Sequence, residues 1–340
     1  LNINLNASYG ITSPMKYLDL MTPDEYANAQ YLAYRNAGKL LQLPQSLSLV
    51  YDSGGNPVGA EIATQYKDVN TDWQRELYRN ASKRDINFSV SGGSKDATYN
   101  LSISNYAQDG NRISTDYQRT SVRLNTSLKK GIFKIGENLT LFTEKSNNPS
   151  NGSRNAAVEV LRQVPILPLH NDDNEGGWNG ANASIFGYDG GNPIGIQRMH
   201  VNQSGSEKMF GNIYLEVRPV NGLILKSSFG VDTNFPHSYL YKPAYKISNT
   251  VSNQENWLQE SRTRNVGWIW DNTVNYNKVI KNHSLGVMVG TSTQENQSRG
   301  INGVTADLPG NGAITVLSAG NNPGTPGGSA SESALVSFFG

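Results

Sequence analysis

The chain has 340 residues; 36% are hydrophobic with Tyr included, 17% are charged, and 40 are Asn. Ordinary domains carry about 25% charged residues, so neutral polar residues take an unusually large share here. The 29 Lys and Arg balance 28 Asp and Glu, and this balance, without a basic run, argues against a nucleic-acid partner. The absence of Cys excludes disulfide scaffolds, thiolate zinc sites and cysteine nucleophiles.

Membrane signals are weak along the sequence. No apolar run approaches the roughly 18 residues of a membrane helix, and the first residues, LNINLNASYG, do not have the charged and then apolar segments of a signal peptide. We therefore expect no helical membrane protein. A transmembrane β-barrel stays open, because its strands alternate in polarity and contain no continuous apolar run.

Alternation with a period of two begins at the first residue and recurs along the chain, which indicates strands with one apolar and one polar face. The first example has Leu1, Ile3, Leu5, Ala7, Tyr9 and Ile11 on one face, with Asn and Ser dominating the other. About ten strands are predicted, near residues 1–11, 86–92, 97–108, 117–129, 132–145, 208–218, 223–232, 263–277, 283–293 and 333–340. The chain is expected to be nearly all β outside its loops.

Two helices are predicted, both in long loops. Thr22 and Glu25 form a capping box with Pro23 at the first helical position, and the helix is expected to end at Gly38. The second covers residues 154–164, RNAAVEVLRQV, and is stopped by Pro165.

The connections between the predicted strands alternate in length. Those at 92–96, 130–131, 219–222 and 278–282 are tight and carry Gly or Asn, as hairpins require, whereas the intervening ones are mostly long. Antiparallel outer-membrane barrels have short periplasmic turns and long extracellular loops. The pattern favours an all-β fold of this kind: a transmembrane β-barrel segment of about ten antiparallel strands.

Aromatic residues stand beside the tight turns. Tyr99, Phe133 and Tyr276 share the parity of the apolar face, where a barrel carries its aromatic girdle. A general preference of aromatic residues for strands explains the same positions equally well.

No catalytic constellation or metal site is apparent. The four His residues, His170, His200, His237 and His283, fit no zinc spacing, and there is no nucleophile elbow, P-loop or dinucleotide fingerprint. The run Asp172, Asp173, Asn174, Glu175 offers hard oxygen ligands for calcium, but it lacks EF-hand spacing, and a solvated acidic loop is the favoured interpretation. No cofactor, metal or enzymatic activity is expected.

The loop from Asn147 to Ser206 is the best candidate for function, because a connection of this length in a compact β protein is usually functional. Aromatic rings stack on sugar C–H faces, and neighbouring amides and carboxylates bind hydroxyls. The predicted substrate-binding residues are Asp172, Asp173, Trp178, Asn179, Phe186 and Tyr188. The residues of this loop are expected to contact either the substrate or a partner that forms a lid. The alternative is that they only pack against neighbouring loops.

Several segments resemble the SusC/RagA group of TonB-linked outer-membrane transporters of Bacteroidetes. These are LDLMTPDEYANA at 18–29, the stretch from TDWQRELYRN at 71 to DYQRTSVRLN ending at 125, VPILPLHNDD at 164–173, NPIG at 192–195 and SFFG at 337–340. The segments occur in family order and span the whole chain, and the stretch from 71 to 125 is the most specific.

The resemblance implies a plugged barrel of the 22-stranded kind that imports glycans, or alternatively peptides, across the outer membrane. It also implies energy from the TonB–ExbB–ExbD system, a SusD-like surface lipoprotein over the mouth, and outer-membrane lipid around the wall. Residues 1–340 are then expected to be a partial barrel domain, without the plug and the terminal strands.

Two other functions are weighed. A soluble carbohydrate-binding β-sandwich explains the polar faces and loop aromatics, with its apolar face buried against a second sheet. A glycoside hydrolase needs two carboxylates about 5 to 9.5 Å apart, and it ranks lowest because it leaves the asymmetry of the loops unexplained.

Overall fold

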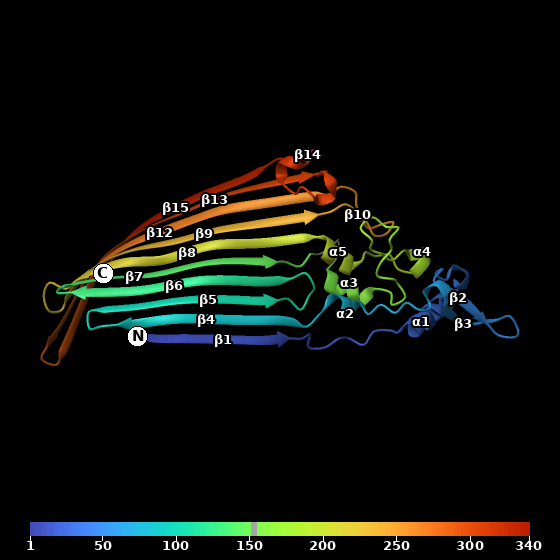
Figure 1. Cartoon of the computed structure of the whole chain (residues 1–340), viewed down its shortest axis with the longest axis horizontal. Helices are drawn as coiled ribbons and strands as arrows, with labels where there is room; N and C mark the ends of the chain where they lie inside the picture. The colour runs from blue at the N-terminus through green and yellow to red at the C-terminus, as the bar shows by residue number, and fades with distance from the viewer. Residues whose placement is uncertain (151–154) are drawn as a thin grey trace.

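The computed structural model describes residues 1–150 and 155–340 and is dominated by one antiparallel sheet of 11 strands (Figure 1). The strands lie in the order β1-β4-β5-β6-β7-β8-β9-β12-β13-β14, with β15 also paired to β13. Their bounds are β1 Asn2–Thr12, β4 Ala81–Gly93, β5 Ala97–Asp109, β6 Asp116–Lys130, β7 Phe133–Asn147, β8 Val201–Val217, β9 Leu223–Lys242, β12 Trp257–Ile280, β13 His283–Ala306, β14 Asn322–Pro323 and β15 Gly327–Phe339. Neighbouring strands are thus mostly consecutive in sequence, as in an up-and-down meander.

The two ends of the sheet differ as the sequence predicts. Hairpins β4–β5, β6–β7, β8–β9 and β12–β13 close with short turns at one end, whereas the long connections gather at the other (Figure 1). The β6–β7 turn places Gly131 at φ 60°, a left-handed conformation that glycine adopts without steric cost. We call these the turn end and the loop end.

All ten predicted strands are present, and most extend further toward the loop end than the alternation of polarity indicates. Strand β9, predicted to stop near 232, runs to Lys242, and β13, predicted to stop near 293, runs to Ala306. In the β13 extension both faces are polar enough to hide the period of two, while the backbone ladder to β12 continues unchanged. The β9 extension contains Pro236, and its ladder to β12 is interrupted at Phe235 and Pro236 before it resumes at His237.

The loop end carries the helices and the small sheets. The helices are α1 Pro23–Asn36, α2 Trp73–Leu77, α3 Ala156–Arg162, α4 Ala183–Phe186 and α5 Pro193–Met199, with short 3-10 turns at Leu40–Gln42, Thr64–Tyr66, Gly310–Gly312 and Leu317–Ala319. Strands β2 Leu47–Tyr51 and β3 Pro57–Ile62 form a hairpin, and β10 Tyr245–Lys246 pairs with β11 Ser252–Asn253. No helix among the described residues is long and apolar enough to cross a membrane.

Both predicted helices are confirmed. The capping box of α1 is complete: the Glu25 amide donates to Thr22 Oγ1 at 3.3 Å, and the Thr22 amide donates to Glu25 Oε2 at 2.8 Å. Helix α3 begins at Ala156, after an N-cap at Asn155. Arg154, the predicted first residue of that helix, lies outside the described residues.

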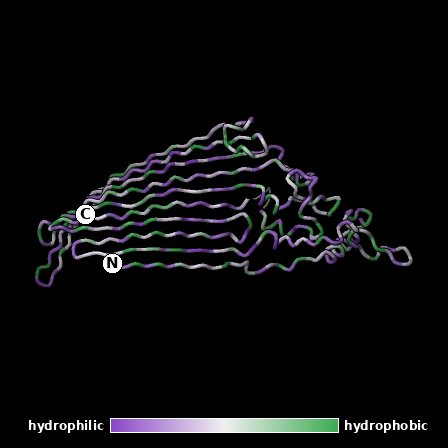
Figure 2. Tube along the Cα trace, viewed as in Figure 1, coloured by the Kyte–Doolittle hydropathy of each residue, from purple (hydrophilic) through white to green (hydrophobic). Residues whose placement is uncertain are grey.

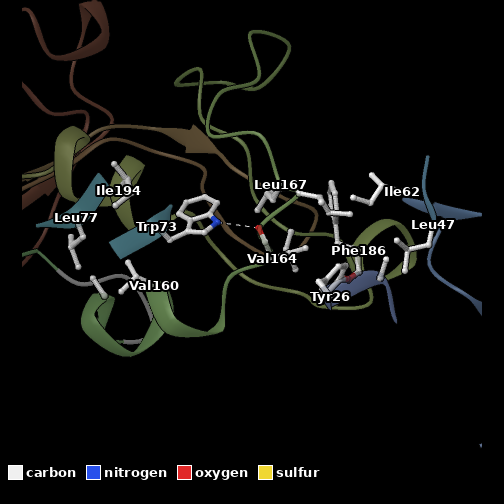
Figure 3. Packing of buried hydrophobic residues seen from close by; sticks show 14 of the residues in the cluster. Tyr26, Leu47, Ile62, Trp73, Leu77, Val160, Val164, Leu167, Phe186 and Ile194 are labelled. Atoms are coloured by element: carbon white, nitrogen blue, oxygen red, sulfur yellow. Dashed lines mark hydrogen bonds between the residues drawn. The ribbon is translucent and has the colours of Figure 1, made fainter. Parts of the chain in front are cut away.

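The main hydrophobic core lies at the loop end rather than on the sheet. Its cluster joins α1, α2, α3 and the chain from Val164 to Ile194, and it includes the fully buried Leu77, Val160, Ile166, Leu167 and Ile194 (Figure 3). Trp73 is tied into it, because its indole Nε1 donates to Val164 O at 3.0 Å. We call this assembly of loop-end elements the loop cap.

Candidate functional site

The sheet presents one apolar and one polar face, and hydropathy alternates along its strands (Figure 2). Cross-strand partners point to the same face, so the register defines each row. One row consists of Ile3, Val90, Leu101, Leu124, Leu139, Gly211, Val231 and Trp268. Many side chains of this face are left exposed, including Ile213 (52%) and Val287 (53%). We call it the apolar face.

The apolar residues form a diagonal band across the sheet. On β1 the apolar side chains run from Ile3 toward Ile11, whereas on β13 they are Leu285, Val287 and Val289, close to the turn end. Along the register from β1 to β13, the centre of the band moves by about 12 residues toward the turn end, which is about 40 Å along the strands. The steps between neighbouring strands from β1 to β13 together span about 38 Å across the sheet. For the whole band to lie at one level along the barrel axis, the strands must be tilted by about 45° to that axis, which is the tilt found in transmembrane barrels.

The opposite face is lined by polar side chains, most of them uncharged, and it also carries the ion pair of Lys208 Nζ and Asp232 Oδ1 at 3.4 Å. One row contains Asn100, Asn125, Asn138 and Asn212, one from each of four consecutive strands. Asn138 Nδ2 donates to Asn212 Oδ1 at 3.1 Å, and Asn212 Nδ2 donates to Ser228 Oγ at 3.0 Å. Such a face suits contact with water or polar groups. We call it the polar face.

The predicted binding residues all lie in the loop cap, where a compact turn from His170 to Trp178 carries three of them. Asp172 and Asp173 are exposed at its tip. Asn174 fastens the base, since its Nδ2 donates to Trp178 O at 2.9 Å and Ile247 O at 3.1 Å. The turn thus holds two carboxylates in solvent on an anchored backbone.

Trp178 closes this turn and is half-buried. Its ring stands 4.3 Å from the His170 ring, measured between centroids. It also packs against Gly195 of α5, where an added Cβ would come within 2.5 Å of Trp178 Cγ. Gly195 is therefore required for the close approach of α5 to the indole.

Asn179 follows the turn and is held through its backbone. Its amide donates to Leu169 O at 3.2 Å, and its carbonyl accepts from Asn192 Nδ2 at 2.8 Å. Asn192 is fully buried and also caps α5 through its Oδ1. The role of Asn192 was not predicted from the sequence, although an Asn-Pro pair at the start of a helix is a readable signal.

The two remaining predicted residues are engaged in packing. Phe186 is 3% exposed and lies edge-on to Tyr66, so its ring is not available for stacking on a ligand. Tyr188 donates from its hydroxyl to Glu159 Oε2 at 2.8 Å, with Arg162 above its ring. The structure therefore leaves Asp172, Asp173 and Trp178 together on one turn, whereas Phe186 and Tyr188 support the cap beneath.

His200 is a further residue that the sequence does not single out. It ends α5, is 7% exposed, and lies 5.9 Å from the Tyr245 ring, measured between centroids. Burial, with a smaller contribution from the positive charge of Lys242, lowers the pKa of His200 to about 4. Within the described part of the chain, no group of three or more His, Asp and Glu residues is placed to hold a metal ion.

Comparison with known proteins agrees with this geometry. No family model matches the chain. It is 25% identical over 349 aligned residues to TonB-dependent receptor P3 of Formosa agariphila, covering 99% of this chain and 31% of the receptor. It is 26% identical to TonB-dependent receptor SusC of Bacteroides thetaiotaomicron, covering 51% of this chain and 15% of that protein. The chain thus spans less than a third of the length of these curated relatives.

Solved structures show the same fold. A chain of the RagAB peptide importer in its closed-closed state matches with a TM-score of 0.74 and 21% identity, covering 99% of this chain and 39% of that one. The open-open state matches with a TM-score of 0.73. The large sheet therefore has the fold of a segment of an antiparallel β-barrel wall, and the relatives that match are described as TonB-dependent receptors and a peptide importer. The chain is thus similar to a part of TonB-dependent receptors, SusC among them, and its fold is that of a part of the RagAB structures.

Proposed function

We propose that this chain forms part of the wall and mouth of a transporter that imports nutrients across the outer membrane with energy from TonB. The observation that carries the proposal is the diagonal apolar band, because an exposed apolar face at a constant height suits lipid and not water. The turn end then faces the periplasm, and the loop cap faces the exterior. Likeness to TonB-dependent receptors supports the same assignment.

The soluble sandwich is disfavoured by the arrangement of the sheets. A sandwich would bury the apolar face against a second sheet of similar size. In the described residues the two other sheets have two strands each, and the apolar face remains exposed.

We propose oligosaccharides as the substrate class, bound in part by the turn from His170 to Trp178. Its exposed carboxylates, Asp172 and Asp173, can accept hydrogen bonds from sugar hydroxyls beside an indole ring. Peptides are the competing class, and the similar RagAB structures are described as those of a peptide importer. A SusD-like surface lipoprotein is proposed as the partner above the loop cap, and TonB–ExbB–ExbD as the energy source.

Two measurements test the transport and the substrate separately. Uptake of labelled oligosaccharides and peptides by cells with and without TonB tests transport, and uptake that does not depend on TonB would refute it. Calorimetry of the purified protein with Asp172→Asn and Asp173→Asn together tests the turn. We expect weaker oligosaccharide binding, whereas the exposed pair Asp19→Asn and Asp68→Asn should bind as the wild type does. Unchanged affinity in the first pair would remove the turn from the site.

A further inference from the structure

The polar face contains a cavity of about 400 Å³ that spans four neighbouring strands, β8, β9, β12 and β13. Two adjacent rows of the register run through it, one from Phe210 to Asn296 and one from Asn212 to Gln294. The polar-face side chains that line it are Phe210, Asn212, Asp232, Ile269, Gln294 and Asn296. None of them is among the binding residues predicted in the loop cap.

Two glycines, one in each row, form the floor of the cavity. A Cβ at Gly267 of β12 would come within 2.5 Å of Asn296 Oδ1. A Cβ at Gly230 of β9 would come within 2.9 Å of Ile269 Cγ2. The side chains of Asn296 and Ile269 therefore rest on the glycines of the neighbouring strands, and the middle of both rows stays low.

Phe210 presents an aromatic ring at one side of this floor. It is 37% exposed, and Lys208 Nζ stands 5.6 Å from the centroid of its ring. The same Lys208 Nζ lies 3.4 Å from Asp232 Oδ1. Among the described residues Asp232 is the one charged residue that lines the cavity, and Lys208 balances its charge. The cavity therefore suits an uncharged ligand.

Two side-chain amides at the other side of the floor are available to a ligand. Gln294 and Asn296 lie two residues apart on β13 and point to the same face, about 7 Å from each other. In the described part of the chain, neither makes a hydrogen bond through its side chain. Each amide can both donate and accept a hydrogen bond. The ring and the two amides thus face one another across the glycine floor.

A sugar matches this combination of groups. Its C–H face stacks on an aromatic ring, while its hydroxyls donate to and accept from amides and carboxylates. A peptide commonly binds a sheet by adding a strand to an edge. Here β8, β9, β12 and β13 are each paired on both sides, so no backbone edge is open to a peptide at this cavity.

We propose that this cavity is a binding site for a neutral oligosaccharide on the inner wall of the barrel. One sugar ring stacks on Phe210, and its hydroxyls bond to Gln294 and Asn296. The inference rests on the proposed function, which places the apolar face in lipid and hence the polar face inside. It adds a second sugar site, within the sheet and apart from the turn from His170 to Trp178.

The test is calorimetry of the purified full protein in detergent with maltohexaose, cellohexaose and mannohexaose. We expect at least one of these sugars to bind. Gln294→Ala with Asn296→Ala should weaken its binding about 30-fold, because two hydrogen bonds are lost. Phe210→Ala should weaken it about fivefold, because the stacked ring is lost, whereas Phe210→Tyr keeps a ring and should keep the affinity.

The matched control is Asn100→Ala with Asn125→Ala. It also removes two amides from the polar face, but on β5 and β6, outside the cavity. This pair should bind the sugar as the wild type does. An equal loss of affinity in the control pair would overturn the proposal, because it would show a general effect of polarity on this face.

Other outcomes would also overturn the proposal. These are binding of none of the three sugars, and full affinity in the Gln294 and Asn296 variant. Displacement of the sugar by acetyl-tetraalanine amide, itself bound more weakly by the same variant, would assign the cavity to peptides. Uptake that depends on TonB is measured separately in cells, so failure of this site can be told apart from failure of the proposed function.

Discussion

The sheet and the loop cap obey opposite rules of burial. On the sheet, apolar side chains such as Leu5 (67%) and Val289 (52%) are exposed, and order comes from continuous backbone ladders. In the loop cap, Leu77, Val160 and Ile194 are fully buried around Trp73. The cap is folded as water-soluble proteins are, by burying apolar surface. The apolar side chains of the sheet instead suit an apolar solvent. Because such a solvent forms no hydrogen bonds, the backbone groups of the strands must be paired with one another.

The largest effect should come from removing the anchor of the loop cap. Trp73→Ala deletes a buried indole and its hydrogen bond to Val164 O, and we expect a loss of about 3 to 5 kcal/mol in the stability of the cap. Hydrogen exchange of amides in residues 156–199 measures it. The matched variant Trp270→Ala removes an indole that is 49% exposed on the apolar face, so the cap should exchange as before. Equal exchange in both variants would mean that Trp73 does not anchor the cap.

The two faces of the sheet should respond differently to the same charge. Leu124→Arg places a cation on the apolar face and should cost about 2 to 4 kcal/mol of unfolding free energy in lipid. Asn125→Arg, one residue along β6, points to the polar face and should cost little. Denaturant titration in lipid vesicles measures both variants. Equal costs would contradict the assignment of the faces.

Acidification should weaken the loop cap and spare the sheet. His200 is neutral when folded, with its pKa lowered to about 4, whereas an unfolded His has a pKa near 6.5. The unfolded state therefore binds the proton first, and stability that is complete above about pH 6.5 falls as the pH approaches 4. At pH 5 the loss should be about 2 kcal/mol. Hydrogen exchange at pH 7 and pH 5 measures it, with His200→Leu as the variant in which this dependence disappears. A wild-type cap equally stable at both pH values would refute it.

The smallest expected effect concerns the start of α1. Thr22→Ala removes the hydroxyl that caps the helix, and we expect a loss of about 1 kcal/mol in the local stability of α1. Ser13→Ala, an exposed hydroxyl outside any helix, is the control. Amide exchange of residues 23–36 separates the two variants, and indistinguishable rates would show that the capping box contributes nothing measurable.

The sheet was predictable because its pattern is local. Period-two alternation, as in Val122, Leu124 and Leu128, determines which residues share the apolar face, and the tight turns determine strand order. The hairpin of β2 and β3 was missed because Pro57 argues against a strand interior, although the Gly-Gly-Asn sequence before it is a turn signal. Here Pro57 begins the strand, where proline is tolerated.

The candidate site was predictable only as a region. The loop from Asn147 to Ser206 is recognisable as a candidate functional region by its length and its aromatic residues. The spacing of those residues in the sequence does not say which ring is buried. Phe186 and Trp178 look alike in the sequence, yet Phe186 faces the core while Trp178 closes an exposed turn. That difference arises from long-range packing, such as the contact between Trp178 and Gly195 of α5, which no local pattern records.

The central claim, that the apolar face contacts lipid, is best tested by a spin-label scan along β6 of the protein in lipid vesicles. The chain has no Cys, so single Cys substitutions from 120 to 128 introduce the only label sites within it. We predict that labels at 122, 124, 126 and 128 collide with membrane-dissolved oxygen, whereas those at 121, 123, 125 and 127 collide with a water-soluble nickel complex or are buried. Loss of the period of two, or oxygen contact on the polar face, would contradict the account.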